Sequence, residues 1–326
     1  FYGGHTAERI AQYCATNGAL ITRSDLKKYH AVWRECITAS YRGRRIVSTG
    51  APTAGLHVLQ TLGILERLDI AQLAPHSTQR LHLLIEALKM ALADRRQMGG
   101  DPDLTPFDPN AILNSDNLDR QAADVDLQRA RVSGTETSSS ASGTTHFVVW
   151  DGDGRVVSAT QSLGYQFGCG EIVDGTGLLM NDRTWWMSLA EGPNQVAPQR
   201  RCNIGHAPTL VFDGARPWIA LGSPGGFGIV PYIVQVLTSI LDQRVDLQTA
   251  IESPRFKLLN LELSVLAEGR FPEKVFEELE AIGHEVKRVG AWTDEVGGVQ
   301  AVMRDLVSGA LAGGYDPRRN SFAAGI

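Results

Sequence analysis

The chain has 326 residues, of which 43% are hydrophobic and 21% charged, and its formal net charge is -5. These values are ordinary for a globular protein with a sizeable core, and the negative charge gives no sign of nucleic-acid binding. The longest apolar run, 229–241, is interrupted by Pro231, Gln235 and Ser239 and is too short to span a membrane. We therefore expect neither a nucleic-acid partner nor a membrane span in this segment.

The predicted elements of the first third are mostly helical. In chain order they are a helix from Thr6 to the Asn17-Gly18 stop, a short helix 25–29 capped by Ser24, strands 37–41 and 45–49, and amphipathic helices 56–68 and 78–98, the last capped by Ser77. The chain opens at Phe1, without a methionine, just before a helix. We expect the natural protein to extend upstream, so the sequence leaves the compartment open.

The four cysteines carry no metal signature. Cys14, Cys36, Cys169 and Cys202 form no C-x-x-C pair and no Cys/His spacing typical of zinc. We interpret them as free buried thiols.

The composition changes at 132–145, which reads V-S-G-T-E-T-S-S-S-A-S-G-T-T. This tract is small and polar, and it lacks periodicity, so taken alone it is most simply a linker. The second half alternates strands and helices: a hairpin of 146–150 and 156–161, strands 178–180, 209–212 and 218–221, helices 229–241, 247–252 and 272–282, and strands 299–303 and 310–312. Strands at both ends with helices between them indicate a layered α/β sandwich.

The linker runs directly into a strand through Gly143 and Thr144, and this arrangement permits self-cleavage. Gly143 has no side chain, so its carbonyl can be approached closely by the Thr144 hydroxyl. An acyl shift from nitrogen to oxygen, followed by hydrolysis, would free Thr144 as a new N-terminus. An α-amino group has a pKa near 7.7–8.0 and suits a base that activates the hydroxyl on its own residue. A plain linker remains the alternative at this point.

A second candidate is the glycine-rich segment 221–228, L-G-S-P-G-G-F-G, between a strand and a helix. Its free backbone N–H groups and the helix N-terminus favour an oxyanion hole. A phosphate loop is disfavoured, because neither G-x-G-x-x-G nor Gly-Lys-Ser/Thr is present. The alternative is a tight strand-to-helix turn.

Taken in order, these motifs resemble the gamma-glutamyltranspeptidase family over essentially the whole chain. The matching segments are F-Y-G-G (1–4), I-T-R-S-D-L-K-K-Y (21–29), A-L-A-D-R-R (91–96), T-T-H-F-V-V-W-D-G-D-G (144–154), F-G-C-G (167–170), G-L-L-M-N (177–181), A-P-T-L-V-F-D-G (207–214), G-S-P-G-G (222–226), S-P-R-F (253–256) and Y-D-P-R-R (315–319). The resemblance implies a four-layer αββα sandwich of the N-terminal-nucleophile hydrolase type. It also implies that about the first third of the full-length protein lies upstream.

The resemblance assigns roles to four residues. Thr144 matches the self-cleaving nucleophile, and Gly225 and Gly226 match the glycines whose N–H groups form the oxyanion hole. Ser162 falls where the family has a threonine whose hydroxyl contacts the amino group of the nucleophile. Cleavage between Gly143 and Thr144 would give two subunits from one precursor, with 1–143 as the distal part of the large subunit and 144–326 as the small catalytic subunit. The chemistry needs neither a metal nor an organic cofactor.

Five departures from the family bear on the substrate. Gly164 replaces an asparagine, Arg183 and Trp186 replace a glutamine and an aspartate, and Ile204 and Gly205 replace two serines. The aspartate would pair with a substrate ammonium, whereas an arginine repels one and can clamp a carboxylate. We therefore expect a small-molecule amide whose acyl group lacks the α-amine, with water or an amine as the acceptor, as in the acylase-like members of the family.

Several alternatives stay open. The protein can be a true gamma-glutamyltransferase acting on glutathione, or a non-catalytic homologue that never matures. Arg183 can be an ordinary ion-paired arginine, and Trp185 and Trp186 can be core or lid residues. We expect His146 and His206 to satisfy local hydrogen bonds rather than act as bases. We also expect the Asp316-Pro317-Arg318 segment to be a turn with a structural ion pair.

Overall fold

A six-stranded antiparallel sheet organises the computed structural model, which describes residues 1–131, 143–259 and 264–325. The strand order is β1-β2-β7-β8-β12-β13. The strands are β1 (Cys36–Tyr41), β2 (Arg44–Thr49), β7 (Thr209–Asp213), β8 (Arg216–Gly222), β12 (Gln300–Arg304) and β13 (Leu311–Gly314). All of them were expected from the sequence, within one or two residues at their ends.

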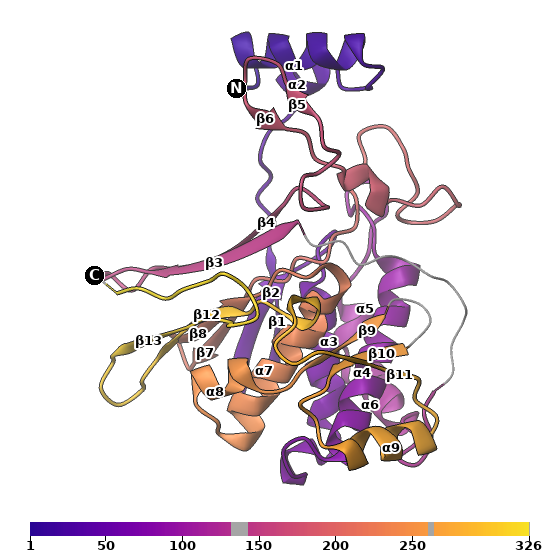
Figure 1. Cartoon of the computed structure of the whole chain (residues 1–326), viewed down its shortest axis with the longest axis vertical. Helices are drawn as coiled ribbons and strands as arrows, with labels where there is room; N and C mark the ends of the chain where they lie inside the picture. Colours follow the sequence, from indigo (N-terminus) through magenta and orange to yellow (C-terminus); the bar gives the residue numbers. More distant parts are fainter. Residues whose placement is uncertain (132–142, 260–263, 326) are drawn as a thin grey trace.

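Helices cover one face of this sheet (Figure 1). They are α3 (Gly55–Glu66), which lies on β1 and β2, α7 (Ile229–Gln243), which packs against α3 and β8, and α4 (Thr78–Met98), which packs behind α3. The predicted amphipathic character is wrong for α3, because every residue from Gly55 to Leu65 is buried between the sheet and α4. The Ser77 cap of α4 is confirmed, since its side chain accepts the Arg80 N–H.

The hairpin of β3 (Thr144–Trp150) and β4 (Val156–Ser162) lies on the other face of the sheet, against β8 and β12 (Figure 1). Its turn forms where the sequence predicts it, with the Asp151 carboxylate accepting the Arg155 N–H and Gly154 at φ +85°. His146 points inward and is buried, whereas Phe147, Val149 and Val157 on the outer face are exposed. In the described part of the chain no helix covers that outer face.

A second sheet of three strands was not predicted, and neither was the short strand β5 (Ile172–Val173). The strands of this second sheet are β9 (Phe256–Leu259), β10 (Ser264–Glu268) and β11 (Val286–Val289), which pair in the order β11-β10-β9. Helix α9 (Glu273–Ala281) packs against β11 and α4, and α8 (Leu247–Glu252) packs against α7 and β13; both were expected from the sequence. The unpredicted α5 (Asn110–Leu113) and α6 (Ser115–Ala123) pack against α3.

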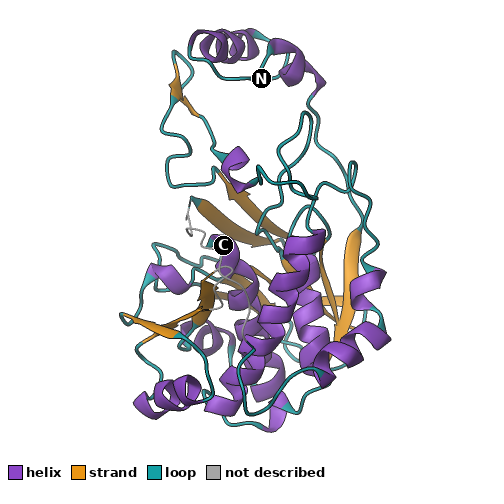
Figure 2. Cartoon of the chain, turned by 90° about the vertical axis from the view of Figure 1, so that its right-hand side faces the viewer, coloured by secondary structure: helices purple, strands orange, loops and turns teal. Residues whose placement is uncertain are grey.

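A small lobe stands apart from the main body (Figures 1 and 2). It joins α1 (His5–Thr16) and α2 (Arg23–Lys28) to the short strands β5 (Ile172–Val173) and β6 (Leu178–Leu179) around Ile10, Cys14 and Val173. The predicted cap of α2 is wrong: Thr22, not Ser24, caps it, in a capping box with Asp25.

The mixed α/β class is confirmed, with helices on one face of the main sheet and a hairpin on the other. Residues 132–142 of the predicted linker tract 132–145 lie outside the described residues. No helix in the described part of the chain is both long and apolar enough to cross a membrane.

The prediction of buried thiols is wrong in part. Cys14 is buried and Cys202 half-buried, but Cys36 and Cys169 are exposed, and all four thiols are free.

Candidate active site

Thr144 opens strand β3 directly opposite Ser162, the last residue of β4. Their hydroxyl oxygens lie 2.9 Å apart. The Ser162 oxygen also accepts the backbone N–H of Gly164, at 3.0 Å. The hairpin register therefore sets the distance between the predicted nucleophile and the predicted supporting hydroxyl, so both positions inferred from the sequence meet in space.

The peptide bond before Thr144 is held tightly. The Gly143 carbonyl oxygen accepts the Leu163 N–H at 3.2 Å and the Ser162 hydroxyl at 3.3 Å, and the Gly143 N–H donates to Gly164 O at 2.8 Å. A Cβ added to Gly143 would lie 1.8 Å from the carbonyl oxygen of Tyr165. Only glycine fits here, and its carbonyl is polarised by two donors before any reaction begins.

The glycine loop lies near Thr144. Gly225 has φ +127° and Gly226 has φ +58°, both in the range that favours glycine. Gly226 begins a 3₁₀ turn that leads into α7, and the first N–H groups of such a helical segment have no acceptor within it. Pro224 and Thr144 line the same cavity of about 970 Å³. Pro224 thus brings the start of the loop to the cavity that Thr144 lines, and the role of the Gly225 and Gly226 N–H groups as an oxyanion hole stays a prediction.

His146 supports the site as a neutral, fixed side chain. Its ring packs on Gly222, where an added Cβ would approach it to 2.2 Å. Ser158 donates its proton to Leu221 O at 3.0 Å, so its oxygen accepts from His146 Nε2, and Nδ1 accepts from Thr160 at 2.8 Å. Burial lowers the pKa of His146 to about 3. The prediction that His146 satisfies local hydrogen bonds is confirmed.

Arg183 and Trp186 lie in a short 3₁₀ turn that borders this hairpin. Arg183 Nη1 donates to Ser162 Oγ at 3.4 Å, and the guanidinium lies 5.5 Å from the centroid of the Trp186 ring. The Trp186 ring packs on Phe227, the neighbour of Gly226, with 5.0 Å between centroids. Trp185, in contrast, is 71% exposed and is not a core residue.

Gly164 cannot be replaced by a larger residue in this backbone. Its φ is +101°, and an added Cβ would lie 1.7 Å from Asp182 Oδ1, the atom that accepts the Tyr165 N–H. The other two substituted positions lie next to the glycine loop. The Ile204 N–H donates to Pro52 O, and an added Cβ on Gly205 would lie 2.4 Å from Gly226 O.

Two arginines near the site, Arg95 and Arg183, have no carboxylate partner among the described residues. Arg95 of α4 is 4% exposed, its Nη2 donates to Asn203 at 3.4 Å, and its guanidinium lies 5.1 Å from the Phe227 ring centroid. Burial and the nearby Arg183 lower the pKa of Arg95 to about 10. Within the described residues no carboxylate lies within 4.0 Å of either guanidinium, so the ion-paired alternative for Arg183 is not supported.

His206 differs from its prediction. Burial and the charges of Arg183 and Arg95 lower its pKa to about 4. Its Nε2 is buried and has no hydrogen-bond partner among the described residues. The expectation that His206 satisfies a local hydrogen bond is therefore wrong for this nitrogen.

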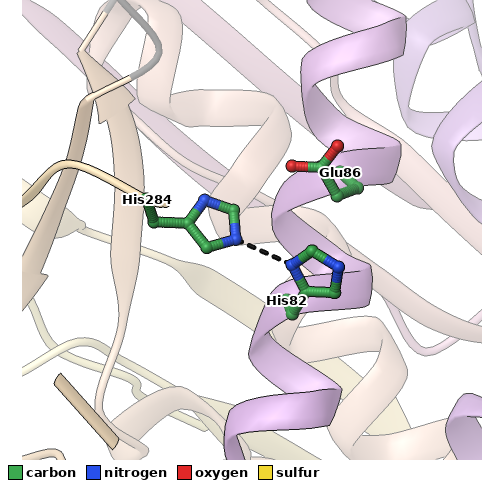
Figure 3. Close-up of side chains that lie close together, drawn as sticks. All are labelled: His82, Glu86 and His284. Carbon is green, nitrogen blue, oxygen red and sulfur yellow. Dashed lines mark hydrogen bonds between the residues drawn. The ribbon is translucent and has the colours of Figure 1, made fainter. Parts of the chain in front are cut away.

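A possible metal-ligating set lies elsewhere, between α4 and the turn after α9 (Figure 3). His82 Nε2 can only donate to Asp126 O, so its Nδ1 accepts from His284 Nε2 at 2.8 Å. Lys89 then donates to His284 Nδ1 at 3.3 Å and to Glu86 at 2.9 Å. The Lys89 ammonium and the imidazole N–H groups already use the atoms that would bind a metal, so we interpret the cluster as a structural network.

The Asp316-Pro317-Arg318 segment forms the ion pair expected from the sequence. Arg318 binds Asp316 at 3.1 Å and holds Glu268 through two N–H groups, at 2.8 and 2.7 Å. Asp316 also pairs with Arg255, and all four side chains are buried. This network fixes the end of β13 to β10, and Pro317 and Arg318 line the same cavity as Thr144.

Sequence reasoning missed three groups at the site. Leu163 contributes a backbone N–H donor, and no pattern of side chains in the sequence indicates such a donor. Phe227 lies between Gly226 and Gly228, and no role was predicted for its ring, which packs on Trp186. Arg95 belongs to the A-L-A-D-R-R segment, 91–96, which resembles the family, and this resemblance was the one signal in the sequence that could have identified Arg95.

The family model described as gamma-glutamyltranspeptidase matches residues 1–326. The chain is 32% identical to the glutathione hydrolase proenzyme of Escherichia coli (strain K12) over 335 residues, covering 98% of this chain and 57% of the relative. It is 36% identical to the acylase ACY 1 proenzyme of Pseudomonas sp. (strain SE83) over 295 residues, covering 88% and 52%.

The fold is similar to the crystal structure of cephalosporin acylase from Bacillus halodurans, with a TM-score of 0.86 and 27% sequence identity. That match covers 98% of this chain and 58% of the other. The chain thus spans between one half and two thirds of the length of these relatives.

Proposed function

This chain belongs to the gamma-glutamyltranspeptidase family, and on that premise we propose that it is a self-processing amidohydrolase with Thr144 as its nucleophile. One observation carries the proposal: the Thr144 hydroxyl lies 2.9 Å from Ser162 Oγ, directly after a glycine whose carbonyl is polarised by two donors. The names of the two curated relatives as proenzymes support a cleavage step.

In the proposed processing step, the Thr144 hydroxyl attacks the carbonyl carbon of Gly143. A C–O bond forms, the C–N bond to Thr144 breaks, and the hydroxyl proton passes to the departing nitrogen. Water then hydrolyses the ester, leaving a carboxylate on Gly143 and a free hydroxyl and amino group on Thr144. The Leu163 N–H and the Ser162 hydroxyl lie where negative charge develops on the Gly143 oxygen.

Turnover repeats this chemistry on an external amide. The freed α-amino group takes the hydroxyl proton of Thr144, the oxygen attacks the substrate carbonyl, and the amine leaves with the proton. Water or an acceptor amine then releases the acyl group from the ester. The N–H groups of Gly225 and Gly226 are proposed to bind the oxyanion, with loss of one such donor typically costing about 10²–10³ in kcat.

The proposal divides the chain at Gly143 and Thr144. Residues 1–143 would be the distal part of the large subunit, and 144–326 the small catalytic subunit. The exposed Phe147, Val149 and Val157 on the outer face of the hairpin support a four-layer αββα sandwich, since a helix layer packed there would bury them.

We further propose that the acyl group lacks an α-amine. Arg183 lies 3.4 Å from Ser162 Oγ, so a substrate ammonium held near Thr144 would face a like charge. Trp186 offers an apolar ring where such an ammonium would need a carboxylate. The Gly164 backbone leaves no room for the asparagine side chain that the family resemblance expects.

A gamma-glutamyl specificity is the second candidate, and Asp182 favours it. This carboxylate belongs to the same loop and lies next to Gly164, so it can supply the anion that Trp186 does not. A comparison of glutathione with an amide that lacks the α-amine separates the two candidates. A non-catalytic homologue is the third, and it predicts a chain that never cleaves.

N-terminal sequencing of the protein expressed from its complete reading frame tests the proposed nucleophile. The small subunit should begin Thr-Thr-His-Phe. Thr144→Ala should stay in one piece and be inactive, whereas Thr144→Ser should still cleave because it keeps the hydroxyl. Thr145→Ala is the matched control, since it changes the neighbouring threonine only, and should process. A new N-terminus at any other residue would refute the assignment.

A further inference from the structure

The chain that follows β4 leaves the main body and returns to it beside the proposed nucleophile. Residues 165–181 form a long loop that carries β5 and β6 and reaches the small lobe, where Val173 is part of the core (Figure 1). The two ends of this loop meet again at the segment 163–165 and Asp182. Asp182 therefore closes the base of a loop whose far end belongs to another part of the molecule.

Asp182 holds the segment 163–165 with both its backbone and its side chain. Its N–H donates to Leu163 O at 3.0 Å, and its Oδ1 accepts the Tyr165 N–H at 3.0 Å. A carboxylate that accepts a backbone N–H forms a charge-assisted hydrogen bond, which is stronger than a neutral one. Between these two contacts Gly164 has φ +101°, and a Cβ added to it would lie 1.7 Å from Oδ1. The carboxylate thus occupies the space that a side chain at Gly164 would need.

The segment that Asp182 holds is the one that contacts the scissile peptide bond. The Leu163 N–H donates to Gly143 O at 3.2 Å, and Gly164 O accepts the Gly143 N–H at 2.8 Å. The Gly164 N–H also donates to Ser162 Oγ at 3.0 Å, and the Ser162 hydroxyl donates to Gly143 O at 3.3 Å. The groups that polarise the Gly143 carbonyl are therefore linked through one short segment to Asp182.

We infer that Asp182 is a positioning residue for self-cleavage, because it fixes the segment 163–165 and so aligns the Leu163 N–H and the Ser162 hydroxyl with the Gly143 carbonyl. The inference rests on the proposed function and adds to it a residue that acts through its neighbours. Donors stabilise a developing oxyanion effectively when they are held in place before the reaction. Without the Oδ1 acceptor the Tyr165 N–H loses its partner, and the segment is free to turn away from Gly143.

The rate of cleavage in precursor made by cell-free translation of the complete reading frame tests this role. A displacement of about 1 Å can cost about 10² in rate, so Asp182→Ala should cleave about 10- to 100-fold more slowly than wild type. Asp182→Asn keeps an oxygen that can accept the Tyr165 N–H and should cleave at close to the wild-type rate. Ser188→Ala is the matched control, because it removes a side-chain oxygen that accepts a different backbone N–H, that of Ala190, and should cleave normally.

Hydrogen exchange in the Thr144→Ala background, which should stay in one piece, separates this inference from the proposed function. In that uncleaved chain Asp182→Ala should speed the exchange of the Leu163 and Tyr165 amides and leave the amides of α7 unchanged. If wild type never cleaves but this local effect is seen, the proposed function fails while the hold of Asp182 on the segment 163–165 stands.

The opposite outcome refutes the inference alone. If wild type cleaves before Thr144 and Asp182→Ala cleaves equally fast, the positioning role is refuted and the proposed function survives. The same conclusion follows if Asp182→Asn is as slow as Asp182→Ala, because the hydrogen bond would then not be the cause. Where Asp182→Ala fails to fold, Asp182→Glu decides: it keeps the charge but displaces the oxygen by one methylene, and a wild-type rate of cleavage would overturn the inference.

Discussion

Lys89 offers a quantitative test of the network in Figure 3. Its ammonium donates to Glu86 at 2.9 Å, to Arg131 O at 2.9 Å and to His284 Nδ1 at 3.3 Å, so all three of its protons are used. Lys89 is 3% exposed and Glu86 is 1% exposed. Lys89→Met would therefore leave the Glu86 carboxylate buried with only the Arg131 N–H as a described partner.

The expected magnitude follows from that loss of charge balance. Removing one partner of a buried ion pair costs about 3–5 kcal/mol, whereas replacing both partners with well-packed neutral groups is close to neutral. Lys89→Met and Glu86→Gln should each lower the free energy of unfolding by about 3 kcal/mol or more. The double variant should lose much less than the two losses added together.

Equilibrium denaturant unfolding of the two single variants and the double variant provides the measurement. Hydrogen exchange of the Arg131 amide gives a local readout, since its N–H donates to Glu86 in the intact network. The reasoning is refuted if each single variant loses less than about 1 kcal/mol, or if the two losses simply add. Lys274→Met is a suitable control, because its contact with Glu278 is solvent-exposed and such pairs contribute little.

Three further predictions follow. Burial lowers the pKa values of His57, His146 and His284 to about 3, from an ordinary 6.5, so the unfolded chain binds protons first as the pH falls. The stabilisation from keeping these three histidines neutral should therefore be complete above about pH 6.5 and should be lost as the pH falls towards 3. The free energy of unfolding should decrease by about 4 kcal/mol per pH unit for the three residues together. A denaturant midpoint that does not change between about pH 6 and pH 4 would contradict this. Gly225→Ala, whose Cβ would lie 2.6 Å from a tyrosine ring, should reduce kcat of the mature protein by about 10²–10³, and a near-normal kcat would make the loop only a turn. Gly143→Ala should slow the appearance of two subunits on a denaturing gel, and an unchanged rate would show that the close packing of Gly143 has no role in cleavage.

Local signals explain what the sequence predicted correctly. The Asp151 turn fixed the β3–β4 register, and that register placed Thr144 opposite Ser162. The Ser77 cap and the Gly99 stop defined α4 to the residue. In each case the information lies within a few residues of the element that it specifies.

Tertiary burial explains what the sequence did not predict. Strand β10 is buried at all five positions, including Ser264 and Glu268, so it shows no alternation that would identify a strand. The polar residues of α4 behave in the same way. Charged residues such as Glu86, Lys89 and Arg95 are expected at solvent-exposed positions of a helix, but other elements cover α4 on more than one side and leave the three side chains buried.

The contacts of Ser162 limit the role that it can have in the proposed chemistry. A hydroxyl has one proton and two lone pairs, and the N–H groups of Gly164 and Arg183 are directed at the oxygen of Ser162. With both lone pairs engaged, Ser162 must donate to Gly143 O or Thr144 Oγ1 and cannot take the proton of Thr144. Ser162 is thus a donor, which leaves the freed amino group as the base in the mature protein.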